Sequence, residues 1–493
     1  MEEKPSIATK TPSALQVAGG LAALALLLLQ ALGFWGASYD DSFITYRYAQ
    51  QFAESGCLCY NDGERVLGTS APGYALLLGL ATFLSGQLIG PAAFGTLASL
   101  VSIASLAVLV QRCSGAASIA SSLIFLLLSL FARWNVEVYG AESFPVAALV
   151  SWSIVSLLGK GPAWLSGLLM AVALSLRFDA ALALPPLLAA YYLRHRTIPV
   201  SFAASLGAPS LAFVAALQLY FGRVVPQTLE SKRAEASPDF AYDVAQGSWL
   251  LLTFSQDYAL IAVLLALATT GILVLARRRS SQALVFGLWL VSHEVFYRAV
   301  GVPFAPWYHV STMLGLFYLT SVGATEVQEL LGQRGSKLRT PVRVLATLIA
   351  LLALARVSSQ AATMWGEPPD PRYEVYRAVG EALHAEPAGT VAAIEIGVIG
   401  YFANEHRVLD LLALVSPEAL EGKRSGDITK TLDEHPPDYL VEVPLFRAEY
   451  GVDQWADLAL SYDLVVQYED PSSGRGTVSL YRRRLSPSTE TRE

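Results

Sequence analysis

Long apolar runs are the feature of this sequence that most restricts its fold. About twenty apolar residues follow the polar start 1–13, which is enough to cross a bilayer, and similar runs recur until about residue 359. The chain of 493 residues is 54% hydrophobic and only 15% charged, with a mean hydropathy of +0.45. The sequence therefore predicts a polytopic α-helical membrane protein.

Lys and Arg residues in the short connections predict how these runs are oriented. Cytoplasmic connections are enriched in basic residues, and a consistent arrangement results if residues 91–111 run from outside to inside. The run 74–86 is too short to span and is then re-entrant or interfacial. This arrangement has about eleven crossings and leaves the C-terminal part outside. The other spans are expected near residues 116–134, 143–159, 162–177, 180–193, 197–221, 248–276, 282–300, 307–324 and 341–359. The basic residues expected inside are Arg112, Lys160, Arg194, Arg196, Arg277, Arg278, Arg279, Arg334, Lys337, Arg339 and Arg343.

The first apolar run has a second interpretation, which is a cleaved secretory signal peptide. The run is longer than the core of such a peptide, and no cleavage site is evident before the polar motif that follows it. We therefore expect the run to stay in the protein as its first helix.

The composition changes at about residue 365, where Pro, Asp, Glu and Arg become frequent and apolar stretches become too short to span a membrane. One stretch has helical spacing, YEVYRAVGEALHAE. Five others are typical of strands: TVAAIEIGVIGYFA, RVLDLLAL, DYLVEVP, YDLVVQYED and GTVSLYRRR. This alternation predicts an extracytoplasmic α/β domain over 365–485, after a transmembrane part over 1–364. The polar tail 486–493 is expected to be disordered.

Charge and cysteine content exclude several classes of function. The net charge is −7, and basic residues gather in a few short loops while acidic residues are plentiful in the last quarter, so nucleic-acid binding is not expected. Three cysteines are present. Two of them, Cys57 and Cys59, are only two residues apart, where closing a disulfide would strain the backbone. The sequence thus predicts neither a disulfide framework nor a metal cluster built on cysteine.

The polar segment 36–75 carries the densest set of chemical groups. Two adjacent carboxylates, Asp40 and Asp41, follow the first apolar run directly, and acids at a membrane surface point to function. From Phe43 to Glu54, aromatic and polar residues are interleaved as in an amphipathic helix that lies along the membrane interface. Gly and Pro residues then break the pattern into turns. We expect a compact outer loop with one interfacial helix.

Five short segments of this loop together form a recognisable pattern: Asp40–Ile44, Tyr46–Ala49, Glu54–Gly56, Tyr60–Asn61 and Gly63–Val66. The pattern resembles the first outer loop of the GT-C superfamily, membrane glycosyltransferases that take a sugar from a polyprenyl-phosphate carrier. The most similar branch is bacterial and includes terminal arabinofuranosyltransferases. The resemblance implies an inverting transfer from a polyprenyl-phosphate sugar to a glycan, lipid or protein acceptor. It also implies a multi-pass protein of the bacterial inner membrane with an extracytoplasmic active site.

The resembling proteins carry in this loop an aspartate proposed as the general base. The spacing to Glu54–Gly56 suits Asp41 better than Asp40. Apolar shelter would raise the pKa of Asp41 and improve it as a base. Asp40 has three interpretations: support of Asp41, part of a divalent-metal site, or the N-cap of the following helix. Tyr46, in the aromatic segment, is a candidate for contact with the substrate.

Basic residues predicted on the outer side are candidates for binding the donor phosphate. Lys232 lies in GRVVPQTLESK, which resembles a pattern of Gly, Pro, polar-Thr and Lys that the family has after its seventh span. Arg177, in a junction of Arg-x-Asp type that the family shares, together with Arg233 and Arg298, would meet the anion through guanidinium groups. The alternative for Arg233 is a side chain that only reaches from the helix end to the interface.

Further outer residues are candidates for binding sugar or acceptor. Glu142 belongs to a Gly-x-Glu motif that the resembling proteins also carry, although a carboxylate at a helix start is stabilised by the helix dipole alone. Asp179 lies in a junction that is too polar to face lipid. The aromatic run Trp307, Tyr308 and His309 would stack on a sugar or prenyl chain, or would only anchor the helix at the interface.

The predicted α/β domain also resembles the branch with a C-terminal extracytoplasmic domain, through Gly397, Gly400, Tyr401 and Asp410. A nucleotide site of Rossmann type is excluded because the glycines do not form GxGxxG. Binding the acceptor or covering the active site are the roles expected instead. The rival classes for the whole chain are a glycolipid transporter or flippase, and a non-catalytic subunit of cell-envelope assembly. A transporter would have repeat halves and charge pairs inside the membrane, whereas the charges here favour one face.

Overall fold

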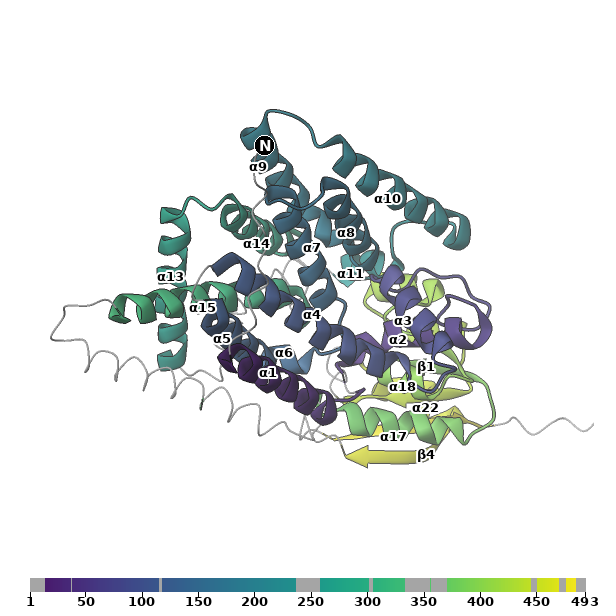
Figure 1. Cartoon of the computed structure of the whole chain (residues 1–493). Coiled ribbons are helices and arrows are strands. Elements are labelled where there is room, and N and C mark those ends of the chain that lie inside the picture. The colour runs from purple at the N-terminus through teal and green to yellow at the C-terminus, as the bar shows by residue number, and fades with distance from the viewer. Residues whose placement is uncertain are drawn as a thin grey trace, which may run out of the picture.

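The computed structural model describes residues 14–36, 38–114, 118–235, 258–300, 305–332, 355, 370–444, 450–469 and 476–484. Figure 1 shows two parts, a body of helices and a smaller part with a five-stranded sheet, in light green and yellow at the lower right. The sheet follows the helices in the chain, as the change in composition predicts.

The body consists of helices, most of which are joined by short connections. The helices before residue 160 are α1 (Ala14–Gly33), α2 (Asp40–Ser55), α3 (Pro72–Leu84), α4 (Pro91–Ser114), α5 (Ser118–Phe131), α6 (Arg133–Glu137) and α7 (Ser143–Leu158). The later ones are α8 (Ala163–Leu176), η2 (Phe178–Ala183), α9 (Leu184–His195), α10 (Val200–Phe221), α11 (Gln227–Glu235), α13 (Tyr258–Arg277), α14 (Ser281–Val300), η5 (Pro306–His309) and α15 (Val310–Gly332). Every predicted span up to residue 324 overlaps one of these helices. The predicted span 341–359 lies outside the described residues, apart from position 355.

Three of the described helices are long and apolar enough to cross a membrane: α4 over Pro91–Cys113, α10 and α13. The case of α10 is the clearest, because apolar side chains remain exposed along it, including Val200 at 74%, Leu211 at 71% and Leu219 at 85%. An apolar surface of this extent needs lipid around it. The chain is therefore an integral membrane protein, and the count of about eleven crossings remains a prediction.

The first apolar run is a packed helix of the body. Gly19 of α1 faces Ile119 and Leu123 of α5, both at van der Waals distance from the position of a Cβ. Beyond the helix, the buried ring of Phe34 lies edge-on to Tyr139, with 6.0 Å between the ring centroids. These contacts make α1 and the residues after it part of the packed helical body.

The C-terminal part is a mixed α/β unit around one sheet. The strands are β1 (Thr390–Ala393), β2 (Arg407–Asp410), β3 (Tyr439–Glu442), β4 (Tyr462–Glu469) and β5 (Thr477–Arg483), in the spatial order β2-β1-β3-β5-β4. Strands β2, β1 and β3 are parallel, and β5 and β4 continue the sheet antiparallel. The helices are α17 (Tyr373–His384), α18 (Gly397–Phe402), α19 (Leu420–Ser425), α20 (Thr429–Glu434) and α22 (Ala456–Ser461), with short η6 (Pro417–Ala419) and η8 (Val452–Gln454).

Alternating residues of the strands pack on opposite faces of the sheet, as a period of two requires. On one face, Val391, Val408 and Val441 belong to the same apolar cluster as the buried residues of α17. The other face, with Ala392, Leu409 and Leu440, forms a separate cluster with α20 and α22. All five predicted strand segments contain a strand. The prediction for TVAAIEIGVIGYFA was wrong in its second half, because that half is the helix α18, whose first amides are bound by a residue far away in the sequence, as described below.

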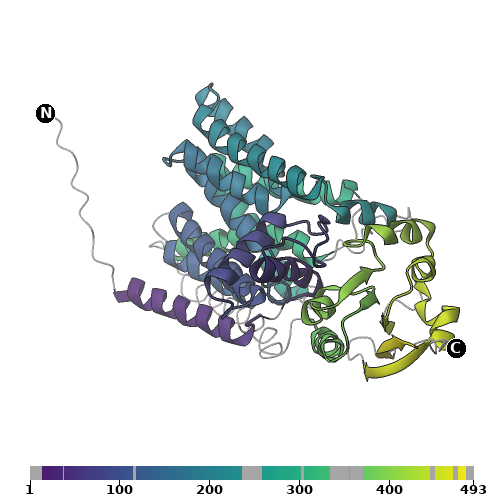
Figure 2. The same cartoon turned by 90° about the vertical axis from the view of Figure 1, so that its right-hand side faces the viewer.

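Segment 36–75 lies between the helical body and the α/β domain (Figure 2). Helix α2 differs from a helix that rests on a lipid surface, because residues on all its sides are buried, including Phe43, Tyr46 and Arg47. Its partners are α3 and α4 of the body and α18 of the domain. The position of the predicted interfacial helix is thus covered by protein.

Most of the polar contacts between this segment and the domain are made to backbone groups of the domain, and we call this set the domain seam. Arg47 is fully buried, and its guanidinium donates to the carbonyls of Gly400 at 2.5 Å and His406 at 2.7 Å. Asn61 exchanges two hydrogen bonds with the backbone of Val408, both 2.9 Å long. The Tyr60 hydroxyl donates to the carbonyl of Ile396 at 2.6 Å. Asp40, described below, is the fourth member.

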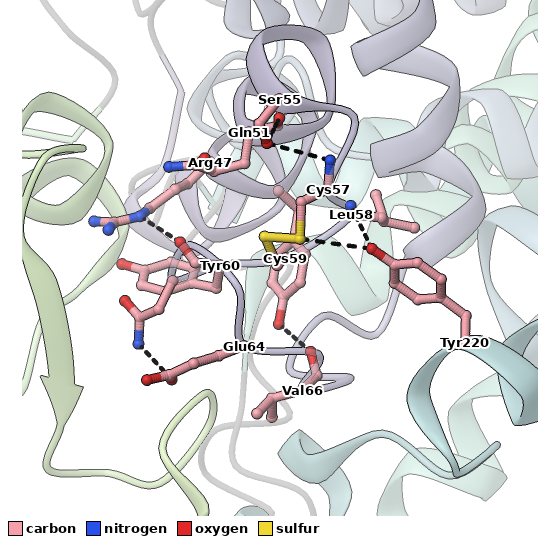
Figure 3. The surroundings of a disulfide bond; sticks show 12 residues. Arg47, Gln51, Ser55, Cys57, Leu58, Cys59, Tyr60, Glu64, Val66 and Tyr220 are labelled. Carbon is pink, nitrogen blue, oxygen red and sulfur yellow. Dashed lines mark hydrogen bonds between the residues drawn. A yellow bond between two sulfur atoms is a disulfide. The ribbon is translucent and has the colours of Figure 1, made fainter.

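A disulfide joins Cys57 to Cys59 in this segment, with 5.3 Å between the two Cα atoms (Figure 3). The expectation that these cysteines would not pair was therefore wrong. The chain bends directly after Gly56, which ends α2 in the left-handed conformation at φ 77°, and the bend brings the two Cα atoms within the usual range for a disulfide. Tyr220 of α10 contacts the pair and accepts a hydrogen bond from the backbone N–H of Leu58 at 3.0 Å.

Candidate active site

Asp41, the predicted base, lies in the first turn of α2. Its side chain is half-buried, and within the described part of the chain no hydrogen bond or ion pair holds its carboxylate. Burial raises the pKa of Asp41 to about 6, and the positive charge of Lys232 opposes part of that rise. Such a carboxylate is ionised at neutral pH and is a stronger proton acceptor than an ordinary aspartate.

Lys232, the predicted phosphate ligand, lies on α11 and is close enough to Asp41 for its charge to act there. Its ammonium donates a hydrogen bond to the Tyr308 hydroxyl at 2.6 Å and lies 5.2 Å from the centroid of that ring. The start of α11 is tied to the outer loop, since the backbone N–H of Gln227 donates to the carbonyl of Leu67 at 2.7 Å. The structure thus brings together the two residues to which the sequence assigned base and cation.

Tyr308 connects Lys232 to polar groups among the helices. Its buried ring stacks on Tyr297 of α14, with 4.3 Å between the centroids. The Arg177 guanidinium also lies over the Tyr308 ring, 5.5 Å from its centroid. Tyr308 is therefore a wall of the candidate site that touches both predicted phosphate ligands, Lys232 through its hydroxyl and Arg177 through its ring.

Arg177 is the centre of a buried polar group that we call the Arg177 cluster. Its guanidinium binds Glu142 at 2.5 Å, Asp179 at 2.9 Å and the Tyr297 hydroxyl at 2.7 Å. His293 of α14 lies 3.4 Å from Asp179, and the Tyr297 hydroxyl also donates to Asp179. Local structure explains the arrangement, because Arg177 ends α8 and Glu142 precedes α7. Arg177 therefore lies beside the candidate site with its guanidinium already held by two carboxylates.

Of the three roles predicted for Asp40, that of the N-cap of α2 is wrong. Asp40 is the first residue of α2, and the N-cap position belongs to Tyr39. Its buried carboxylate accepts hydrogen bonds from the backbone N–H groups of Gly397 at 3.1 Å and Val398 at 2.8 Å, at the start of α18. A Cβ on Gly397 would lie 1.9 Å from the Asp40 carbonyl oxygen, so only glycine fits there. Asp40 thus holds the domain against α2.

A second carboxylate lies beside Asp40 on the domain side. Glu395 is bound at 2.8 Å by Arg372, which also binds Asp370 at 2.8 Å. Burial and the adjacent Asp40 charge hold the pKa of Glu395 well above its usual range. In the part of the chain that the structure describes, no group of three or more His, Cys, Asp or Glu side chains has an arrangement suited to a metal ion.

The remaining candidates have diverse environments. Trp307 is half-buried, and its ring lies 5.0 Å from that of Tyr39 next to Asp40. His309 is buried and pairs with Glu294 at 2.9 Å, with Nδ1 towards the carboxylate. Tyr46 is fully buried in the core and presents no surface to a ligand in this conformation. Arg233 is exposed on α11. The side chain of Arg298 lies outside the described residues.

Two adjoining cavities open next to these groups. A cavity of about 790 Å³ lies among α4, α5, α7, α13, α14 and α15, and its walls are mainly apolar, with Leu109, Leu275 and Tyr318 among them. A smaller polar pocket is lined by Arg177, Asp179, His293 and Trp307. Two residues, Trp289 and Ser311, line both. A large apolar cavity thus adjoins a small pocket lined by charged side chains.

Sequence reasoning did not identify several residues of this region. His293 and Glu294 are adjacent on α14, and the structure pairs His293 with Asp179 and Glu294 with His309. Tyr297, which links Tyr308 to the Arg177 cluster, was not singled out. Its spacing of four residues from His293 on one helix places both on the same face, and this spacing was the available signal.

Comparisons with known proteins agree with this architecture. ArnT from Cupriavidus metallidurans in the apo state aligns over 95% of this chain and 98% of its own, with 15% identity and a TM-score of 0.58. The chain has the ArnT fold. The same protein bound to undecaprenyl phosphate aligns over 96% and 98%, with 12% identity and a TM-score of 0.57. The likeness and the structure together confirm the coarser prediction of a mostly helical protein with a small C-terminal sheet domain.

Two further comparisons complete the picture. Residues 366–481 match a family model described as a domain of unknown function, DUF8728. No curated protein matches the sequence. The match covers the α/β part of the chain and leaves its role open.

Proposed function

We propose that the protein is an inverting membrane glycosyltransferase that moves a sugar from a polyprenyl-phosphate donor to an acceptor hydroxyl, with Asp41 as the general base. The observation that carries the proposal is the approach of a carboxylate without a described hydrogen-bond partner, Asp41, to the Lys232 ammonium beside the Arg177 cluster. A base and a cation in this arrangement match what transfer from a phosphate leaving group requires.

The reaction can be written with these groups in defined roles. Asp41 accepts the proton of the acceptor hydroxyl as its oxygen forms a bond to the anomeric carbon. The bond from that carbon to the phosphate oxygen breaks, and the polyprenyl phosphate leaves with the electron pair. Lys232 neutralises the developing negative charge on this phosphate. A single displacement of this kind inverts the anomeric centre, as the resemblance to the GT-C superfamily implies.

The two adjoining cavities support a lipid-linked donor. The prenyl chain would occupy the apolar cavity of about 790 Å³, because a chain of this kind is stabilised by leaving water. The charged end would lie near the polar pocket and Lys232, and Trp289 and Ser311 line both spaces. ArnT, which has the same fold, has been crystallised with undecaprenyl phosphate.

Several finer elements of the proposal rest on the sequence. These are the similarity to terminal arabinofuranosyltransferases, the placement in a bacterial inner membrane, and the extracytoplasmic position of the site and of the domain over 365–485. The donor ligands include Lys232, Arg177, Arg233 and Arg298. The acceptor is a hydroxyl of a glycan, a lipid or a protein. A divalent metal is not required by the steps assigned to Asp41 and Lys232.

Replacement of Asp41 by asparagine tests the proposal directly. The amide keeps the volume but cannot accept the proton, so transfer from a panel of polyprenyl-phosphate sugars should fall by about a hundred- to ten-thousand-fold in proteoliposomes. Asp62→Asn, at an exposed carboxylate of the same loop, is the matched control and should change little. Activity of Asp41→Asn within about tenfold of the unmodified protein would exclude this base. Full transfer activity of both Asp40→Asn and Asp41→Asn would remove the catalytic role from this loop, whereas absence of transfer by the unmodified protein with every donor would favour a transporter of the same lipids.

A further inference from the structure

The α/β domain binds the residue directly before each of the two central candidates. On α2 it binds Asp40, next to Asp41, through the N–H groups of Gly397 and Val398. On α11 it binds Ser231, next to Lys232. The Ser231 hydroxyl donates to the carbonyl of Leu412 at 2.6 Å and accepts a hydrogen bond from the Lys423 ammonium at 2.8 Å. All of these side chains on the body side are buried, as is Lys423.

Both binding points lie at one edge of the sheet. Strands β1 and β2 are parallel neighbours, and their last residues, Ala393 and Asp410, are partners in the register. The amides that hold Asp40 come four and five residues after Ala393, and the carbonyl that binds Ser231 comes two residues after Asp410. Carboxyl ends of parallel strands meet at the same edge. Because β1 and β2 are hydrogen-bonded to each other, they fix the separation between the amides that bind α2 and the carbonyl that binds α11.

The loop that follows β2 is itself held in place by hydrogen bonds. The Asp410 carboxylate accepts hydrogen bonds from the backbone N–H groups of Leu412, at 2.9 Å, of Val415, at 2.9 Å, and of Leu414. These bonds hold the loop that presents the Leu412 carbonyl in one conformation. The same loop packs against the outer segment, where Gly68 leaves no room for a Cβ beside Val415.

We infer that the domain is a spacer that sets the separation between Asp41 and Lys232, and that Asp40, Ser231 and Lys423 are positioning residues. The inference rests on the proposed function for its catalytic meaning. The base must reach the acceptor hydroxyl while the phosphate ligand reaches the leaving phosphate of the same donor. A misplacement of either group by about 1 Å can cost on the order of a hundredfold in rate. Binding the preceding residue fixes the backbone at Asp41 and Lys232, and none of these contacts is made to the Asp41 or Lys232 side chain itself.

Two sets of variants in the full chain separate this role from simple support of the fold. On the first anchor, Asp40→Ala removes both acceptors, whereas Asp40→Asn keeps one. On the second anchor, Ser231→Ala and Lys423→Met break the same link from opposite sides, and Lys430→Met, at an exposed lysine of the same domain, is the control. The readouts are the transfer rate, the affinity for undecaprenyl phosphate as a probe, and backbone hydrogen exchange of residues 227–235 and 397–402.

Different outcomes are expected for the two anchors. Asp40→Ala should lower the transfer rate by about tenfold or more with little change in the affinity for undecaprenyl phosphate, and Asp40→Asn should recover part of the rate. Ser231→Ala and Lys423→Met should each weaken undecaprenyl phosphate binding by about three- to tenfold, and the double variant should be no worse than the poorer single variant. Exchange should increase at 397–402 for the first set and at 227–235 for the second.

The spacer role is wrong if exchange increases at these segments while rate and probe affinity stay unchanged, because the contacts would then support the fold alone. It is also wrong if exchange does not change in any variant. Failure of the proposed function has a separate signature, which is absence of transfer by the unmodified protein with every donor of the panel. In that case the probe affinity and the exchange measurements still decide whether the domain sets the position of α11 and α2.

Discussion

Two buried polar regions flank the candidate site, and they compensate their charges in opposite ways. In the Arg177 cluster the guanidinium is bound by two carboxylates, Glu142 and Asp179, so charge meets charge among the helices. In the domain seam, Arg47 binds backbone carbonyls and Asp40 binds backbone amides, so each charge meets dipoles of the other part. Both regions are shielded from bulk solvent, because Arg47 and Asp40 are at most 2% exposed and Arg177 is 7% exposed.

The difference indicates separate tasks. A charge matched by opposite charges keeps its geometry when no ligand is present, which suits a fixed wall of a site. A charge that is bound by backbone groups is stabilised only when another chain segment follows one particular backbone path. Such an interaction suits the joining of two parts of a protein. Asp41 lies between the two regions and has neither kind of partner among the described residues. The following variants test this division, in order of decreasing effect.

The largest effect is expected from Arg177→Leu. Glu142 and Asp179 would remain buried without their cation, which costs about 3–5 kcal/mol of unfolding free energy. Thermal or denaturant unfolding in detergent measures this loss. Addition of Glu142→Gln and Asp179→Asn to the same chain should restore much of the stability, because no net charge then stays buried. A loss smaller than that of the next variant would overturn the assignment of charge pairing to this cluster.

A smaller effect is expected from Arg47→Met in the domain seam. The carbonyls of Tyr60, Gly400 and His406 would each lose a donor. The change also removes a charge whose burial is itself unfavourable, so the net loss should be about 1–3 kcal/mol. No charge is left unpaired, so the loss should stay below that of Arg177→Leu. Hydrogen exchange should increase around residues 400–406 and leave the Arg177 cluster unaffected. Equal increases in both regions would show that the two are not independent.

The next effect concerns pH and the group between the two regions. Asp41 acts as a base only when ionised, and burial places its pKa at about 6. Transfer should therefore fall as pH drops through about 6. Lys232 lowers this pKa, so Lys232→Met should move the acidic limb of the rate profile upward by about one unit, which corresponds to about 1.4 kcal/mol. An unchanged limb in this variant would separate Lys232 from Asp41.

The smallest effect is expected at an exposed pair of the domain. Arg377 and Glu381 form an ion pair of 2.8 Å one helical turn apart on α17, with side chains that are 44% and 55% exposed. Arg377→Gln should change the unfolding free energy by no more than about 0.5 kcal/mol. A loss comparable to that of Arg47→Met would mean that the measurement does not separate buried from exposed charges.

The sequence was sufficient for the parts of the site that depend on local pattern. Asp41 and Lys232 each lie in a short motif, and the structure places them close to one another. The apolar periodicity predicted the helices, and the change in composition predicted the sheet domain. These features depend on neighbouring residues, which a sequence displays directly.

Partners that are distant in the chain could not be predicted in this way. Nothing next to Asp40 shows that its acceptors are filled by amides 357 residues later, and nothing next to Arg47 shows that its donors face carbonyls of the domain. The helix α18 was mistaken for part of a strand for the same reason, because its apolar sequence is compatible with both and the contact with Asp40 decides. The disulfide was missed since the bend after Gly56 is a property of the folded loop.

The bond between Asp40 and the start of α18 also has a consequence for biosynthesis. A ribosome delivers position 40 early and position 397 only after most of the helices between them have been made. The outer loop is therefore not yet packed against the α/β domain while the membrane helices are inserted. Its buried charges, Asp40 and Arg47, find their partners only when the α/β part has reached the same side and folded. A chain released before that point would carry Asp40 without the amides of Gly397 and Val398 that bind it, so the start of α2 would lack its contact with the domain.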